Sequence, residues 1–140
     1  MRVALLVALS ASALAGCAPG SPGACLPNDP TLEPAAVHVG ESFRVSIEGF
    51  RPGGDGGCTA SLAPGTTYTV RLSEQYGGFE VVLDELEAPA DGALDQEYVV
   101  PPGAPAGPYG LVVMVSGTRF SCERPDTECA VPGAGLRVED

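Results

Sequence analysis

The chain has 140 residues and a formal net charge of −11 at pH 7, from seven Arg, no Lys and eighteen Asp and Glu. This length allows one domain with a real core but hardly two, and the acidity argues against nucleic acid and anionic lipid headgroups as partners. Gly and Pro number 19 and 14. They lie between short alternating apolar runs, which is typical of turns in an all-β domain rather than of disorder.

The amino terminus has the order of a secretory signal: Arg2, an apolar run over residues 3–14, then small residues. The run is too short to span a membrane as a helix, which needs ~20 apolar residues. Leu14-Ala15-Gly16-Cys17 follows it and resembles the lipobox of bacterial lipoproteins. The resemblance implies a signal peptide over residues 1–16, cleavage between Gly16 and Cys17, and a diacylglyceryl group on the Cys17 thiol.

The same resemblance implies a location on the extracytoplasmic face of a bacterial membrane, with membrane lipid as a partner through Cys17. Two or more acyl chains anchor a protein stably, because each buried methylene contributes ~0.8 kcal/mol. The alternative is ordinary secretion, since Ala11-Ser12-Ala13 and Ala13-Leu14-Ala15 also fit a small-x-small cleavage site. Cys17 would then be a free or paired thiol in a soluble secreted protein.

Residues 17–34 are predicted to form a tether that follows the lipidated cysteine. The segment is rich in Pro, Gly and small residues and has no helix signal. Its prolines stiffen it, so it should hold the domain some distance from the membrane.

From residue 35 the sequence predicts seven short strands. Alternation is clear over residues 43–48, where Phe43, Val45 and Ile47 share one face. Residues 109–116 are apolar on both faces, as in a central strand. The remaining strands are expected at 35–39, 68–73, 79–86, 94–100 and 135–139. Seven strands separated by Gly/Pro turns predict a β-sandwich.

Residues 35–140 resemble the immunoglobulin-like modules of bacterial surface proteins. Gly49-Phe50, Val100-Pro101 and Gly107-Pro108-Tyr109 occupy the places of turns that are frequent in those modules. The resemblance implies a single immunoglobulin-like sandwich. Tyr109 is either the donor of a tyrosine-corner hydrogen bond or a plain core aromatic.

Four cysteines remain when Cys17 is set aside: Cys25, Cys58, Cys122 and Cys129. In an exported protein an even set is expected to pair, and alternating strand direction puts all four at the same end of the sandwich. Three pairings are possible. We favour Cys25–Cys58 with Cys122–Cys129, because the intervening "ERPDTE" can close a small loop. Zinc is disfavoured, since no Cys-x-x-Cys pair is present and His38 is the sole histidine.

The sequence predicts no catalytic residue, cofactor or metal. It has no Gly-x-Ser-x-Gly elbow, and the carboxylates between Glu80 and Glu97 lack the spacing of an EF-hand. The connection over residues 118–133 is the best candidate for recognition of a protein or small molecule. It carries Arg119, Phe120 and Arg124, residue types favoured at interface hot spots, although a loop without a partner is the alternative.

Three functions fit these observations. The favoured one is a membrane-anchored extracytoplasmic lipoprotein with a non-catalytic binding or structural domain. The second is a small-ligand carrier that resembles the disulfide-bearing β-sandwich apoproteins that hold an apolar chromophore between loops. The third is an enzyme, which would need His38 within hydrogen-bond reach of a carboxylate and a hydroxyl.

Overall fold

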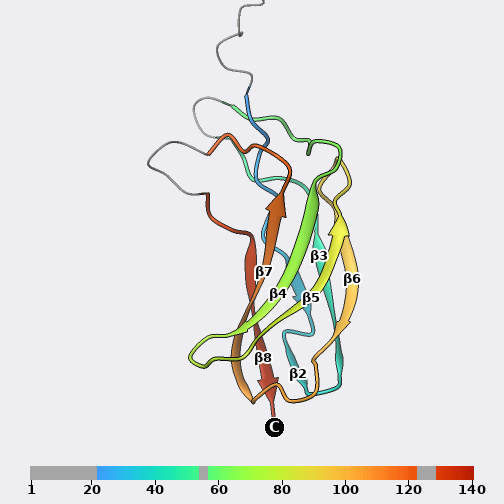
Figure 1. Cartoon of the computed structure of the whole chain (residues 1–140), viewed down its shortest axis with the longest axis vertical. Helices are drawn as coiled ribbons and strands as arrows, with labels where there is room; N and C mark the ends of the chain where they lie inside the picture. Colours follow the sequence, from blue (N-terminus) through green and yellow to red (C-terminus); the bar gives the residue numbers. More distant parts are fainter. Residues whose placement is uncertain (1–21, 54–56, 123–128) are drawn as a thin grey trace, which may run out of the picture.

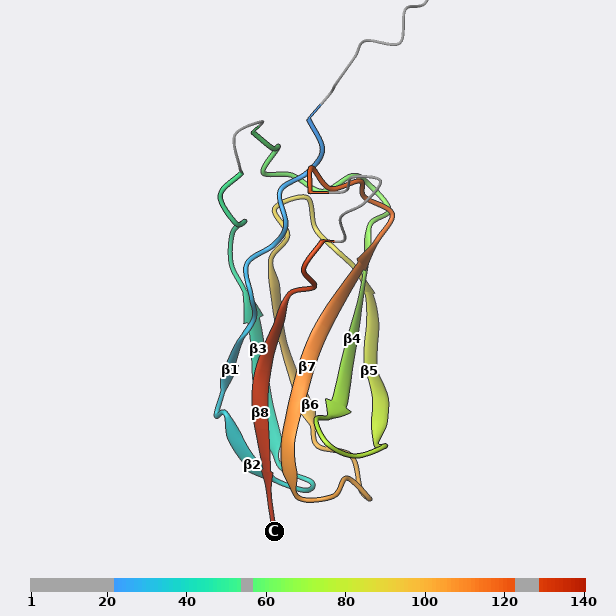
Figure 2. The ribbon, with the colours of Figure 1, turned by 90° about the vertical axis from the view of Figure 1, so that its left-hand side faces the viewer.

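The domain is a sandwich of two β-sheets. The structure is a computed structural model that describes residues 22–53, 57–122 and 129–140, and these form strands and turns without a helix. One sheet has the order β1-β3-β6 and the other β2-β8-β7-β4-β5 (Figures 1 and 2). The strands are β1 (Thr31–Glu33), β2 (Ala36–His38), β3 (Ser42–Ile47), β4 (Thr67–Glu74), β5 (Glu80–Glu87), β6 (Leu94–Val99), β7 (Gly107–Ser116) and β8 (Gly133–Glu139). The predicted all-β sandwich is confirmed.

The structure has eight strands where the sequence predicted seven, because the first strand is divided between the sheets. β1 pairs antiparallel with β3, whereas β2 pairs parallel with β8. Pro34 lies at the switch, and its missing N–H prevents it from continuing a ladder as a donor. The strand predicted at 35–39 corresponds to β2, and β1 falls in the segment predicted to be a tether.

The predicted tether is corrected: residues 22–33 belong to the domain. Ala24 is buried, its N–H donates to the Arg119 carbonyl at 2.9 Å, and the Cys25 N–H donates to the Thr59 carbonyl at 2.9 Å. Gly23 lies so close to Phe120 that a Cβ would be 2.6 Å from its carbonyl carbon. Residues 17–21 lie outside the described part of the chain.

Alternation along the strands builds the core. Tyr68, Val70 and Leu72 of β4 are fully buried, as are Leu111 and Val113 of β7. These positions have a period of two, so one face of each strand packs between the sheets and the other faces outward.

Three buried tyrosines place their hydroxyls on acceptors, as buried phenols require. Tyr68 donates to the Gly92 carbonyl at 2.7 Å, and Tyr98 donates to Asp84 Oδ2 at 3.0 Å. Tyr109 donates to the Pro105 carbonyl at 2.7 Å. Tyr109 therefore makes the tyrosine-corner hydrogen bond, and it is also a core aromatic at 2% exposure.

A β-bulge in β5 changes which side chains face outward. The register with β4 runs from Val70 opposite Asp84 to Arg71 opposite Val82, so Leu83 is the extra residue. The shift leaves Asp84 directed toward Tyr98 of the other sheet. Val82 turns outward and is 47% exposed.

Candidate functional site

Both disulfides lie at the end of the sandwich where the described chain begins. Cys25 bonds to Cys58 with a Cα–Cα distance of 4.9 Å, and Cys122 bonds to Cys129 at 5.5 Å. This is the pairing favoured from the sequence. In Figure 1 the blue start of the described chain lies at the top, and the carboxyl terminus lies at the bottom. Disulfides persist in oxidising compartments, so they indicate a secreted or extracytoplasmic protein.

The residues predicted for recognition do not form a common surface. Phe120 is 5% exposed and belongs to the hydrophobic core, so it is not available to a partner. Arg119 is exposed and lines an open hollow of about 490 Å³ with Leu62 and Thr118. Arg124 lies outside the described residues. Phe120 is buried because the segment around Ala24 pairs with it, a long-range contact that the local sequence does not reveal.

His38 and the acidic side chains are the other groups that the sequence singled out. Within residues 22–53, 57–122 and 129–140, no group of three or more His, Cys, Asp or Glu side chains is placed to hold a metal ion. His38 is 52% exposed, with Nε2 3.8 Å from Glu139 Oε2 at the end of β8. Over the same residues no helix is long and apolar enough to cross a membrane.

The outer face of the five-stranded sheet is a second candidate, which the sequence reasoning missed. Val82 of β5 and Met114 of β7 point outward and are 47% and 41% exposed. Val112, half-buried, lies in the same row as Val82 and Gly133, with Arg71 between the two valines. Val131 is 51% exposed. We call Val82, Val112, Met114 and Val131 the outer patch.

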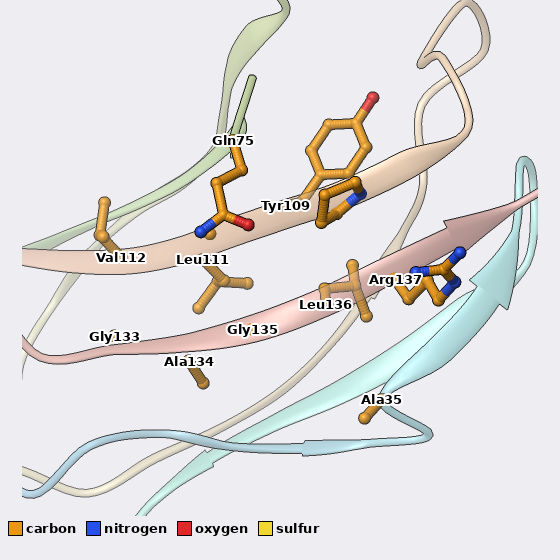
Figure 3. Close-up of a pocket in the computed structure, with 12 residues that line it drawn as sticks. Ala35, Gln75, Tyr109, Leu111, Val112, Gly133, Ala134, Gly135, Leu136 and Arg137 are labelled. Atoms are coloured by element: carbon orange, nitrogen blue, oxygen red, sulfur yellow. The ribbon is translucent and has the colours of Figure 1, made fainter. Parts of the chain in front are cut away.

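The outer patch continues into an open groove of about 580 Å³ along β7 and β8. Its floor is the cross-strand pair Gly110 and Gly135. Figure 3 shows Val112 at one end of the groove, Arg137 at the other, and Gln75 above β7. The sequence carried one signal of this surface: residues 109–116 are apolar on both faces, which predicted cover on both sides.

Charges on this face are unevenly distributed. Glu80, Glu85 and Glu87 are exposed on β5, and Arg71 Nη1 lies 3.5 Å from Glu80 Oε1. The Nε of Arg71 is buried without a hydrogen-bond partner among the described residues. Arg137 on β8 is exposed and has no carboxylate within ion-pair distance in the described part of the chain.

Asp29 fixes the amino-terminal segment to the start of β8. Its Oδ1 accepts the Gly133 N–H at 3.1 Å and a guanidinium N–H of Arg51 at 2.5 Å. The Gly133 hydrogen bond is the main reason that the pKa of Asp29 lies below its ordinary value, and the Arg51 side chain adds to it. The contact joins Asp29 to the first residue of β8.

Comparison with known proteins identifies no family. No family model and no curated protein matches the chain. Among solved structures, a similar one is the Pseudomonas fluorescens alkylpurine DNA glycosylase AlkC bound to DNA containing an abasic site analog, with a TM-score of 0.49 and 12% identity. The match covers 82% of this chain and 30% of that one.

The comparison corrects the partners predicted from the sequence. That prediction excluded nucleic acid and named membrane lipid at Cys17. The similar protein was solved bound to DNA, and the comparisons support neither the exclusion of nucleic acid nor the lipid partner at Cys17. At this TM-score and identity the likeness carries no argument about what the present chain binds.

Proposed function

We propose that the chain is an exported bacterial lipoprotein, acylated at Cys17, whose β-sandwich is a non-catalytic binding or structural module outside the cytosol. One observation carries it: of five cysteines, four pair with each other in two disulfides. Cys17 is left without a cysteine partner in its own chain.

The position of this odd cysteine favours lipoprotein over plain secretion. Cys17 directly follows Leu14-Ala15-Gly16, where a lipobox places the acylated residue. An exported free thiol would be open to oxidation or intermolecular pairing. An alkylated thiol is protected from both.

The test is intact-mass spectrometry of the full-length chain expressed in a bacterial host. The wild type should be recovered in the membrane fraction, beginning at Cys17 and carrying a diacylglyceryl mass. Cys17→Ser should abolish this mass. The matched control, Cys25→Ser/Cys58→Ser, changes two cysteines but keeps the lipobox, and it should remain acylated.

Two outcomes would contradict the proposal. One is a soluble protein that begins after Ala13 or Ala15 with an unmodified Cys17. The other is the uncleaved precursor with five titratable thiols, which would also remove the argument for export.

A further inference from the structure

The outer face leaves apolar side chains in solvent. Six large hydrophobic side chains are strongly exposed in the described structure, and three of them belong to the outer patch: Val82, Met114 and Val131. The Val113 N–H donates to the Pro132 carbonyl at 2.9 Å. This bond extends the pairing of β7 with β8, so Val131 lies beside Met114. Clustered exposed apolar residues are typical of interaction surfaces.

The glycines of the groove support close approach from outside. Gly110 and Gly135 face each other across β7 and β8, and neither has a positive φ. A Cβ at either position would meet no atom within 4 Å. Neither backbone conformation nor packing within the described chain therefore requires glycine here. Glycine in a strand interior often marks a place where another backbone approaches.

We propose that the outer patch and groove form the interface with a second copy of this chain, around a twofold axis parallel to the strands between β4 and β7. This axis places β4 over the partner's β7 and β5 over the partner's β8. Val82, Arg71, Val112 and Gly133 lie in one row across the sheet. Val82 of each copy therefore faces the position of Gly133 in the other, so an exposed valine side chain meets a residue without a side chain.

The distribution of charge favours an axis parallel to the strands over one perpendicular to them. Exposed carboxylates lie on β5, and Arg137 lies on β8, about 14 Å away across two intervening strands. Within one copy they are therefore too far apart to pair. The proposed axis brings Glu80 of one copy near Arg137 of the other. A twofold axis perpendicular to the strands would instead place β5 over β5 and oppose their carboxylates.

The orientation also agrees with anchoring at Cys17, and on this point the inference rests on the proposed function. The blue start of the described chain and the carboxyl terminus lie at opposite ends of the sandwich (Figure 1). An axis parallel to the strands keeps both copies of residue 22 at the same end. Both anchors then reach one membrane.

The size of the face makes the contact weak in solution. Four strands about 4.8 Å apart and about eight residues long give a face of about 500 Å². Stable interfaces bury about 800 Å² per partner, and the net charge of −11 on each copy adds repulsion. Confinement to a membrane raises the effective concentration of the chains, and this offsets both the small contact area and the charge repulsion.

The test is crosslinking of the full-length protein in bacterial membranes with a short bis-maleimide. Met114→Cys places a thiol near the proposed axis. The matched control is Val99→Cys, because Val99 is 52% exposed but lies on β6 of the other sheet. Met114→Cys should give at least five times as much crosslinked dimer as Val99→Cys. Equal crosslinking in the two variants would overturn the proposal.

Two further changes in the Met114→Cys background separate the interface from folding. Gly135→Leu fills the groove, so it should abolish the excess without lowering the free energy of unfolding. Arg137→Glu should reduce the excess, and Arg137→Glu/Glu80→Arg should restore it. Unchanged crosslinking in Gly135→Leu would refute the interface.

Mass spectrometry of the same samples distinguishes this inference from the proposed function. An acylated chain that does not crosslink refutes the dimer alone. If Cys17 is not acylated, the proposed function fails, and the dimer is tested by sedimentation of the purified chain at millimolar concentration. The wild type should then self-associate and Gly135→Leu should not; equal behaviour of the two overturns the dimer.

Discussion

Removing the Cys25–Cys58 disulfide should destabilise the domain more than removing Cys122–Cys129. The two bonds join residues 33 and 7 positions apart. In the chain-entropy model, their constraint on the unfolded chain contributes about 3.7 and about 2.4 kcal/mol respectively. Cys25 is also 6% exposed, so replacing it removes packing as well. We therefore expect Cys25→Ala/Cys58→Ala to lose at least about 1.3 kcal/mol more than Cys122→Ala/Cys129→Ala.

Urea unfolding followed by far-ultraviolet circular dichroism measures both losses, because a domain of this size has about 5–15 kcal/mol of stability and remains folded after either. Extrapolation to zero urea gives the free energies of unfolding. A thiol reductant added to the wild type should reproduce the sum of the two entropic losses. Equal losses, or a larger loss for Cys122→Ala/Cys129→Ala, would refute the reasoning that the loss grows with the length of the loop that each disulfide closes.

Three further predictions concern buried groups, each measured by the same urea denaturation. Tyr109→Phe removes the donor to the Pro105 carbonyl 2.7 Å away, so we expect the free energy of unfolding to fall by about 1–1.5 kcal/mol. An unchanged free energy of unfolding would contradict a stabilising role for the tyrosine-corner hydrogen bond. Burial raises the pKa of Tyr68 to about 12, against about 10 in the unfolded chain. The contribution of the neutral Tyr68 side chain to the free energy of unfolding is therefore complete below pH ~10 and is lost as the pH rises through about 12. In Tyr68→Phe the free energy of unfolding should fall less steeply over this pH range. Gly92 has a φ of 70°, and a Cβ there would lie 3.0 Å from the Phe50 ring, so Gly92→Ala should cost more than Gly103→Ala. Gly103 has a φ of 88° and open space, so its loss should be about 1–2 kcal/mol from backbone strain alone.

The sandwich could be predicted because its strands are local patterns. Phe43, Val45 and Ile47 alternate along β3, and all three are at most 1% exposed. The cysteines could be placed because alternating strand direction assigns each connection to one end. These inferences need only the period of a strand and the direction of the chain.

The rest depends on contacts between distant segments. Ala24 bridges to Thr59 and Phe120, so a proline-rich segment that resembles a linker is folded, and an aromatic that resembles an interface residue is in the core. The outer patch was missed for a related reason. Apolar residues on both sides of β7 predict two covered faces, whereas the described chain covers only the side that faces the other sheet.

The opposite placement of the two termini has a mechanical consequence. A pull between the amino-terminal segment and Asp140 runs along the strands, because the chain begins at one end of the sandwich and β8 finishes at the other. Such a load shears the ladders of β8 with β7, so many backbone hydrogen bonds resist together instead of opening one after another. The Cys25–Cys58 crosslink transfers part of the same load to residue 58 before it reaches β1.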